Sequence, residues 1–215
     1  AHELNTPLST VMGFTELLLN SDDLERATQQ EYLAIILSKT ETLEYIIEDL
    51  LALSRAEGGQ KVAIEREPCD LRKLIGGLLG SYRKEHGTRQ FHLDWPDQES
   101  EILDLDRIKI GQAFENLLSN AIKFSPANTP VEIRVTPTDG DVSISVKDQG
   151  KGLSSKQVSK AFDKFYRADM SNTSIPGLGL GLSITKAIIE AHGGSIQIES
   201  SLGHGTIVCV TLPKL

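Results

Sequence analysis

The first 57 residues contain a single glycine, Gly13, and a single proline, Pro7. Because these two residue types disfavour helix interiors most strongly, such a stretch is open to long helices. Its apolar residues recur at alternating spacings of three and four. They are Leu4, Leu8, Val11 and Leu18, with Thr15 in the gap, and Leu33, Ile36, Leu43, Ile47 and Leu50, with Thr40 in the gap. This spacing is typical of helices that pack on other helices, so we predict two helices joined by a turn over 20–23.

A lone helical hairpin buries little apolar surface. We therefore expect a second copy of the chain to pack against residues 1–57 and complete a four-helix bundle. The alternative is a hairpin that packs on the remainder of its own chain.

The tripeptide Gly58-Gly59-Gln60 ends the helical pattern and indicates a linker, which we place at 58–61. Beyond it, residues 62–215 mix the two periodicities. We predict strands over 62–65, 91–95, 131–135, 142–146, 196–198 and 207–212, and helices from the capping residue Asp70 to Leu79, over 106–124 and over 178–191. Neighbouring strands joined by short turns, with helices on one side, predict an α+β sandwich.

Charge and composition exclude several classes of protein. The formal net charge is −8 and no block of Lys and Arg occurs, so we expect neither nucleic acid nor an anionic membrane surface as a partner. No apolar run reaches the roughly 18 residues of a transmembrane helix. Cys69 and Cys209 form no C-x-x-C pattern, which is typical of a reducing compartment. Because the chain begins at Ala1 without Met and is already helical in pattern, we expect it to be a piece of a longer protein.

The first candidate for chemistry is the segment that begins with His2 and Glu3. Leu4 belongs to the apolar seam, which leaves His2 off the seam and toward solvent. An accessible imidazole with a pKa near 6.5 is largely neutral at pH 7, and a neighbouring carboxylate can fix its tautomer, so His2 is a candidate nucleophile. Thr6 lies four residues further along and shares the same helical face. Alone, this pattern also fits an incidental surface histidine.

The second candidate is the predicted helix that carries Asn116, Asn120 and Lys123 at positions i, i+4 and i+7. These side chains share one face, while the apolar residues between them face the core. Amide oxygens are hard ligands that suit Mg²⁺, and an ammonium group suits a phosphate. No Asp or Glu completes a metal cage on that face, so water and substrate phosphates would complete the coordination. A polar solvated helix face is the alternative.

Two glycine-rich segments follow. In the first, a strand ends at Asp148, whose carboxylate can accept a hydrogen bond from an exocyclic amine such as that of adenine, and Gly150 and Gly152 let the backbone approach a ring. A plain turn is the alternative. In the second, Gly177, Gly179 and Gly181 open a predicted helix, whose N-terminus is a site for anions. This segment is neither the dinucleotide fingerprint nor a Walker A loop.

In this order, the four segments resemble those of the sensor histidine kinases of two-component signalling. His2–Leu8 is similar to the H-box, Asn116–Lys123 to the N-box, and 148–152 and 177–181 to two glycine boxes around ATP. Residues 162–167 and 203–206 are similar to the F-box and the last glycine box. The resemblance spans essentially the whole chain. It implies a dimeric four-helix bundle for dimerisation and phosphotransfer over 1–57, then a catalytic domain over 62–215 with the Bergerat ATP-binding fold, a mixed sheet with helices on one face.

The resemblance also implies roles for single residues. His2 would accept the γ-phosphoryl group through Nε2, Glu3 would orient and deprotonate it, and Thr6 would position water for dephosphorylation of a partner. Asn120 would bind Mg²⁺ with help from Asn116. The other residues implied to bind ATP are Lys123, Asp148, Gly150, Gly152, Arg167, Gly177, Gly179, Gly181 and Thr206. The chain departs from the usual H-box at Asn5, where the family commonly has Arg.

The expected function is ATP-dependent autophosphorylation of His2, followed by phosphoryl relay to an aspartate in the receiver domain of a response regulator, with phosphatase activity toward that regulator. Related ATPases carry a Glu where this chain has Asn116, and an amide cannot accept a proton from water, which argues against efficient ATP hydrolysis. The alternative is a nucleotide-binding scaffold, or a phosphatase-dominant signalling protein, with a degenerate kinase step. The family implies a cytoplasmic homodimer and a parent protein anchored to a membrane through upstream segments.

Overall fold

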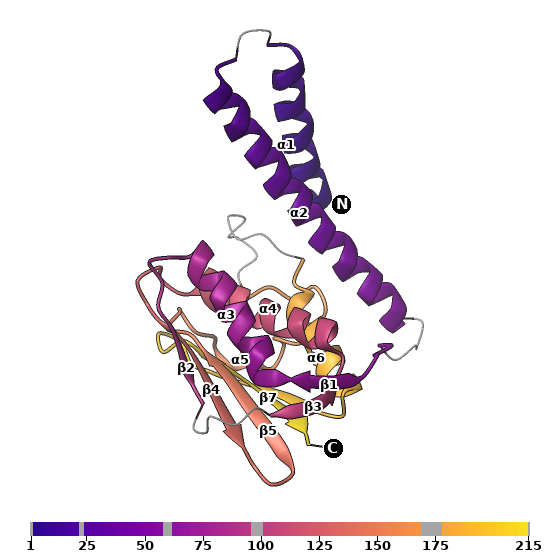
Figure 1. The fold of residues 1–215 in the computed structure, drawn as a ribbon, viewed down its shortest axis with the longest axis vertical. Helices are drawn as coiled ribbons and strands as arrows, with labels where there is room; N and C mark the ends of the chain where they lie inside the picture. The colour runs from indigo at the N-terminus through magenta and orange to yellow at the C-terminus, as the bar shows by residue number, and fades with distance from the viewer. Residues whose placement is uncertain (1, 22–23, 58–61, 96–100, 169–177, 215) are drawn as a thin grey trace.

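The computed structural model describes residues 2–21, 24–57, 62–95, 101–168 and 178–214. Its first part is an antiparallel helical hairpin, formed by α1 (His2–Leu19) and α2 (Arg26–Glu57). The rings of Phe14 and Tyr32 pack between the two helices, with centroids 5.0 Å apart. The predicted hairpin is confirmed. Helix α2 is much the longer of the two and continues past α1 beside the second part of the molecule (Figure 1).

The second part is built on two sheets. A five-stranded sheet has the order β2-β4-β5-β7-β6, in which β2 runs parallel to β4 and the other neighbours are antiparallel. A small antiparallel sheet pairs β1 with β3. The strands are β1 (Glu67–Asp70), β2 (Phe91–Asp94), β3 (Ile102–Leu105), β4 (Val131–Pro137), β5 (Asp141–Lys147), β6 (Ser195–Ser200) and β7 (Thr206–Pro213). The helices are α3 (Leu71–Glu85), α4 (Arg107–Phe124), α5 (Ser155–Val158) and α6 (Gly181–Ala191).

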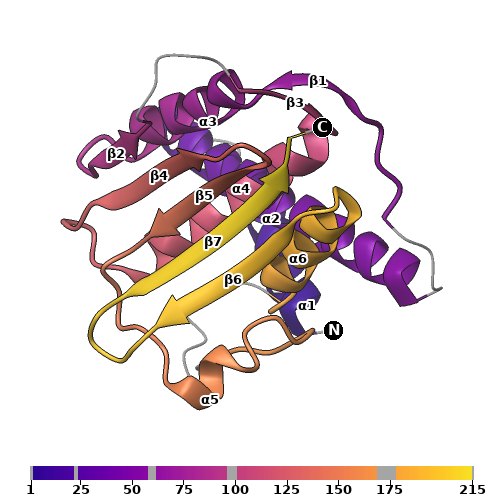
Figure 2. The same ribbon diagram turned by 90° about the horizontal axis from the view of Figure 1, so that it is seen from below.

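Helices α3, α4 and α6 lie on the same face of the large sheet (Figure 2). The strands β4 and β5 alternate, so that every second residue is buried against these helices. The largest fully buried side chains between the layers include Phe114, Leu117 and Leu118 of α4 and Ile133 and Ile144 of the sheet. The predicted sandwich, with a mixed sheet and helices on one face, is confirmed.

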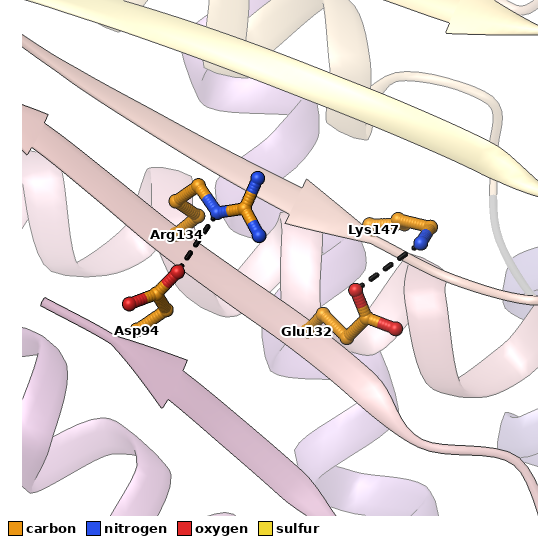
Figure 3. A network of polar contacts seen from close by, with 4 residues as sticks. All are labelled: Asp94, Glu132, Arg134 and Lys147. Carbon is orange, nitrogen blue, oxygen red and sulfur yellow. Dashed lines mark hydrogen bonds and ion pairs between the residues drawn. The ribbon is translucent and has the colours of Figure 1, made fainter.

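The opposite face of the sheet is polar. Figure 3 shows two ion pairs on it that join neighbouring strands. Arg134 Nε lies 2.9 Å from Asp94 Oδ2, and Lys147 Nζ lies 3.1 Å from Glu132 Oε2. Both pairs join residues directly opposite each other in the strand register. Because all four side chains remain partly exposed to water, each pair contributes less than about 1 kcal/mol to stability.

The ends of two helices follow from local sequence. Asp70 accepts a hydrogen bond from the backbone N–H of Lys73, and Asp106 accepts one from Lys109, each at 3.0 Å. An aspartate that caps the third helical residue in this way is typical of a helix start. The predicted cap at Asp70 is therefore confirmed.

Asp106 also joins segments that are distant in sequence. Its second carboxylate oxygen accepts from the backbone N–H of Glu65 at 3.0 Å. Its own N–H donates to Nε2 of the buried His192, at the end of α6, and His192 Nδ1 lies 2.8 Å from the carbonyl oxygen of Ile188. The residue thus ties the segment after the linker to both α4 and α6.

Several predicted elements differ from those in the structure. Residues 62–65 belong to no strand: the Glu65 N–H donates to the side chain of Asp106, and strand pairing begins at Glu67. The last helix begins at Gly181 and not at residue 178, because Gly179 has a φ of 73°, which an α-helix does not accommodate. Strands β1 and β3 and the short helix α5 have no counterpart among the predicted elements, and α3 continues beyond the predicted Leu79 to Glu85.

The linker at 58–61 and part of the turn at 20–23 lie outside the described residues. Within the described part of the chain, no helix is both long and apolar enough to span a lipid bilayer.

Candidate active site

A cavity of about 240 Å³ lies among α4, α6, the sheet and the segment before residue 169. Its walls come from parts of the chain that are far apart in sequence. The predicted nucleotide-binding residues among its lining are Asn116, Asn120, Lys123, Asp148, Gly152, Arg167, Gly179, Gly181 and Thr206. Gly150 contacts Asp148 directly, and Gly177 lies outside the described residues. The structure therefore brings the N-box segment and the glycine-rich segments into one cavity.

Helix α4 supplies one wall of the cavity. Its buried residues Leu117 and Leu118 face the core, which turns Asn116 and Asn120 toward the opening. The Asn120 Nδ2 lies 3.4 Å from Asn116 Oδ1, and the Asn116 Nδ2 donates to the hydroxyl oxygen of Thr185 at 2.8 Å. The two amides thus form a short chain of hydrogen bonds that ends on α6.

Asp148 stands at the end of β5 and is only 8% exposed. Its Oδ1 accepts from the Gly150 N–H at 2.7 Å, and its own N–H donates to the Thr206 carbonyl oxygen at 2.9 Å. Burial raises the pKa of this carboxyl group, although the backbone N–H groups of Gly150 and Thr206 and the positive charge of Arg89 oppose the rise. A buried, fixed carboxylate of this kind is suited to recognise a hydrogen-bond donor.

The charges around the cavity favour an anion. Lys123, Lys151 and Arg167 are basic, whereas Asp148 is the sole acidic residue in the described lining. The remaining lining is largely apolar and includes Val146, Leu182, Ile198 and Val208. The apolar part of the lining therefore suits a flat apolar ring, and the basic side chains suit phosphate groups.

A divalent cation would find few protein ligands here. In the parts of the chain that the structure describes, no group of three or more His, Cys, Asp or Glu side chains could hold a metal ion. The side-chain amides of Asn116 and Asn120 line the cavity, and the Asn116 oxygen already accepts a hydrogen bond from Asn120. This donor set fits Mg²⁺, which retains several waters and takes further oxygens from phosphates.

Three residues at or near the site were not assigned to it by the sequence pattern. Lys151 lines the cavity, and its position in the sequence between the two predicted glycines could have indicated this. Thr185 resembles an ordinary residue of an amphipathic helix. Arg89 has no local motif at all.

Arg89 fastens the end of α4 next to the cavity. It is 9% exposed, and its guanidinium donates to the hydroxyl oxygen of Ser125 at 2.6 Å and to the carbonyl oxygens of Ser125 and Pro126 at 3.2 and 2.9 Å. Burial lowers the pKa of Arg89, and the negative charge of Asp148 opposes that change. A cation at a helix C-terminus also stabilises the helix dipole.

The predicted phosphoacceptor segment belongs to the other part of the molecule. His2 begins α1, but the side chains of His2 and Glu3 lie outside what the structure describes. Thr6 is exposed on α1 and is not among the lining residues of the cavity.

Comparisons with known proteins agree with this division. Residues 1–59 match the family described as His Kinase A (phospho-acceptor) domain. Residues 105–215 match the family described as Histidine kinase-, DNA gyrase B-, and HSP90-like ATPase. The sensor histidine kinase WalK of Bacillus subtilis (strain 168) is 32% identical over 220 residues, covering 99% of this chain and 35% of WalK. The chain thus spans about a third of the length of that relative.

Solved structures show the same architecture. Full-length ShkA in complex with AMPPNP has a TM-score of 0.73 and 26% identity over 99% of this chain and 44% of that one. Histidine kinase ThkA in complex with the response regulator protein TrrA has a TM-score of 0.71 and 25% identity over 100% of this chain and 60% of that one. With its phospho-acceptor hairpin and its ATPase-fold domain, the chain belongs to the sensor histidine kinases of two-component systems.

Proposed function

We propose that the chain transfers the γ-phosphoryl group of ATP to His2 and then to an aspartate in the receiver domain of a response regulator. The observation that carries this proposal is the convergence of the N-box and glycine-rich segments on one basic cavity. The AMPPNP in the ShkA structure and the regulator TrrA in the ThkA structure support both halves of the reaction. We assign residues 1–57 to dimerisation and phosphotransfer, 58–61 to the linker, and 62–215 to catalysis.

The polar residues predicted from the sequence have these roles in the proposal. The buried Asp148 accepts a hydrogen bond from the exocyclic amine of adenine, whose ring lies against the apolar lining. Lys123 and Arg167 contact the phosphates, and Thr206 holds the backbone of Asp148 in place through its carbonyl oxygen. Asn120, assisted by Asn116, would hold Mg²⁺, whose charge would offset that of the phosphates.

The transfer step requires in-line positioning more than covalent help from the protein. The Nε2 of a neutral His2 attacks the γ-phosphorus, the bond to the bridging oxygen breaks, and ADP leaves. Glu3 orients the ring and takes the proton from Nδ1 as positive charge develops there. Asn116 occupies the position where related ATPases carry a basic carboxylate, and no carboxylate of α4 is among the described lining residues of the cavity, where it could activate water in competition with His2.

We also propose that the hairpin forms a homodimer. Several large apolar side chains of α1 and α2 are 46–60% exposed in the single chain, namely Leu8, Met12, Leu17, Leu33, Leu37 and Ile47. A second hairpin would bury them in a four-helix bundle. The reaction belongs in the cytoplasm, where ATP and response regulators are found.

The experiment that tests the proposal is incubation with Mg·ATP, followed by assay for a phosphoryl group that is acid-labile and base-stable. The matched variant is His2→Gln. A label that the substitution abolishes supports histidine phosphorylation. No label despite measurable nucleotide binding would contradict it and favour a nucleotide-binding scaffold. Loss of regulator dephosphorylation in Thr6→Ala, with the label intact, would support the proposed phosphatase role.

A further inference from the structure

Thr185 is a polar residue at a position where packing alone would favour an apolar one. It is 0% exposed, and the other buried residues of α6 are Ile188 and Ile189. A valine has nearly the same shape as threonine and would fill the same space. The hydroxyl group therefore needs an explanation other than packing.

The explanation lies across the interface with α4. The Thr185 hydroxyl oxygen accepts a hydrogen bond from Asn116 Nδ2 at 2.8 Å. This bond holds the Nδ2 end of the Asn116 carboxamide on α6, while Asn116 Oδ1 lies 3.4 Å from Asn120 Nδ2. Asn120 then directs its Nδ2 toward Asn116, at 3.4 Å, and its Oδ1 to the other side of its own amide.

Gly181, one helical turn before Thr185, also contacts Asn116. A Cβ atom at Gly181 would collide with the carboxamide of Asn116, so this amide packs directly on the backbone of α6. Asn116 is thus held by two successive turns of α6, by contact at Gly181 and by a hydrogen bond at Thr185.

We propose that Thr185 is a positioning residue of the nucleotide site: through Asn116, its hydroxyl orients Asn120 so that the Asn120 amide oxygen faces the Mg²⁺ that accompanies ATP. This inference rests on the proposed function, since it concerns the same cavity. It assigns Asn116 to holding Asn120, because both polar atoms of the Asn116 amide already have protein partners. Partners that orient a ligand typically change metal affinity by 10-fold or more when they are removed.

The test uses two substitutions, Thr185→Val, which keeps the shape and removes the hydroxyl, and Thr185→Ser, which keeps the hydroxyl. Thr211→Val, on β7 and outside the cavity lining, is the matched control. The dissociation constant for ADP is measured by calorimetry with Mg²⁺ and again with EDTA. We expect Thr185→Val to weaken binding about 10-fold with Mg²⁺ and less than about 2-fold with EDTA. Thr185→Ser and Thr211→Val should bind like the parent chain in both conditions.

A second readout needs no nucleotide. In the free protein, the ¹⁵N-labelled side-chain amide of Asn116 should change its chemical shift in Thr185→Val and keep it in Thr185→Ser. Equal losses with and without Mg²⁺, or no loss at all, in Thr185→Val would overturn the positioning role while leaving the proposed function intact. A parent chain that binds ADP no better with Mg²⁺ than with EDTA would overturn the metal role of Asn120, and this inference with it.

Discussion

Arg89→Met should destabilise the ATPase-fold domain because it removes the side chain that fastens the end of α4. The guanidinium makes three hydrogen bonds, to the Ser125 hydroxyl and to the carbonyl oxygens of Ser125 and Pro126. At a net value of about 1 kcal/mol for each, their loss lowers the free energy of unfolding by about 3 kcal/mol. Methionine retains most of the buried aliphatic volume, so cavity formation adds little.

The control is Arg83→Met. Arg83 is an exposed arginine in the neighbouring helix α3, and it makes one hydrogen bond, to the Phe91 carbonyl oxygen at 2.9 Å. We expect its loss to cost less than about 1 kcal/mol. Urea unfolding can be followed by the fluorescence of Trp95, the sole tryptophan of the chain, which is buried beside β2. The reasoning is refuted if the two substitutions lower the free energy of unfolding by the same amount.

Three further predictions address the site, the acid stability and the dimer. Asp148→Asn should weaken ADP binding at least about 10-fold in calorimetry. The urea midpoint of unfolding, followed by Trp95 fluorescence, should stay unchanged or rise slightly, because burial already disfavours the charged form of Asp148. A lower midpoint would point to a structural role. Burial opposes the charged form of Asp106, but the N–H groups of Glu65, Lys109 and Ile108 lower its pKa overall. The stability that the charged Asp106 adds to the fold is therefore complete above the pKa of the unfolded chain, about 3.9, and is lost as pH falls through the pKa of the folded state. Asp106→Asn should therefore cost stability at pH 7 and progressively less below about pH 4, and a cost independent of pH would contradict this. Leu33→Glu combined with Leu37→Glu should weaken self-association at least about 100-fold in sedimentation experiments, whereas Ile108→Glu, on α4, should not; equal effects would argue against a hairpin interface.

The parts of the fold that sequence predicts well are those with local causes. Asp70 sits three residues before the N–H that it caps, so a short window of sequence contains the whole interaction. The alternation of β4 and β5 is equally local, since one face of each strand meets the core and the other meets water. Asp148 could be identified because the glycines that accompany it are its immediate neighbours.

The parts that sequence could not predict depend on distant partners. Strand β3 is a short segment whose pairing is supplied by β1, and residues 62–65 alternate like a strand but bond to Asp106 instead. Arg89 meets its acceptors across 36 positions of sequence, and Thr185 meets Asn116 across 69. No periodicity signals such contacts, so a buried arginine and a buried threonine remain unremarkable until the fold brings their partners together.

The unequal lengths of the two hairpin helices give α2 the properties of a lever. At 1.5 Å per residue, its 32 residues form a rod of about 48 Å, against about 27 Å for the 18 residues of α1. The rod contains neither Pro nor Gly, so it has no sequence-encoded kink. A tilt of α2 by about 5° about its N-terminal end would move its C-terminal end by about 4 Å, which is comparable to the rise of a helical turn. Small angular changes in the hairpin would thus become displacements at the ATPase-fold domain that are large enough to separate or join reacting groups.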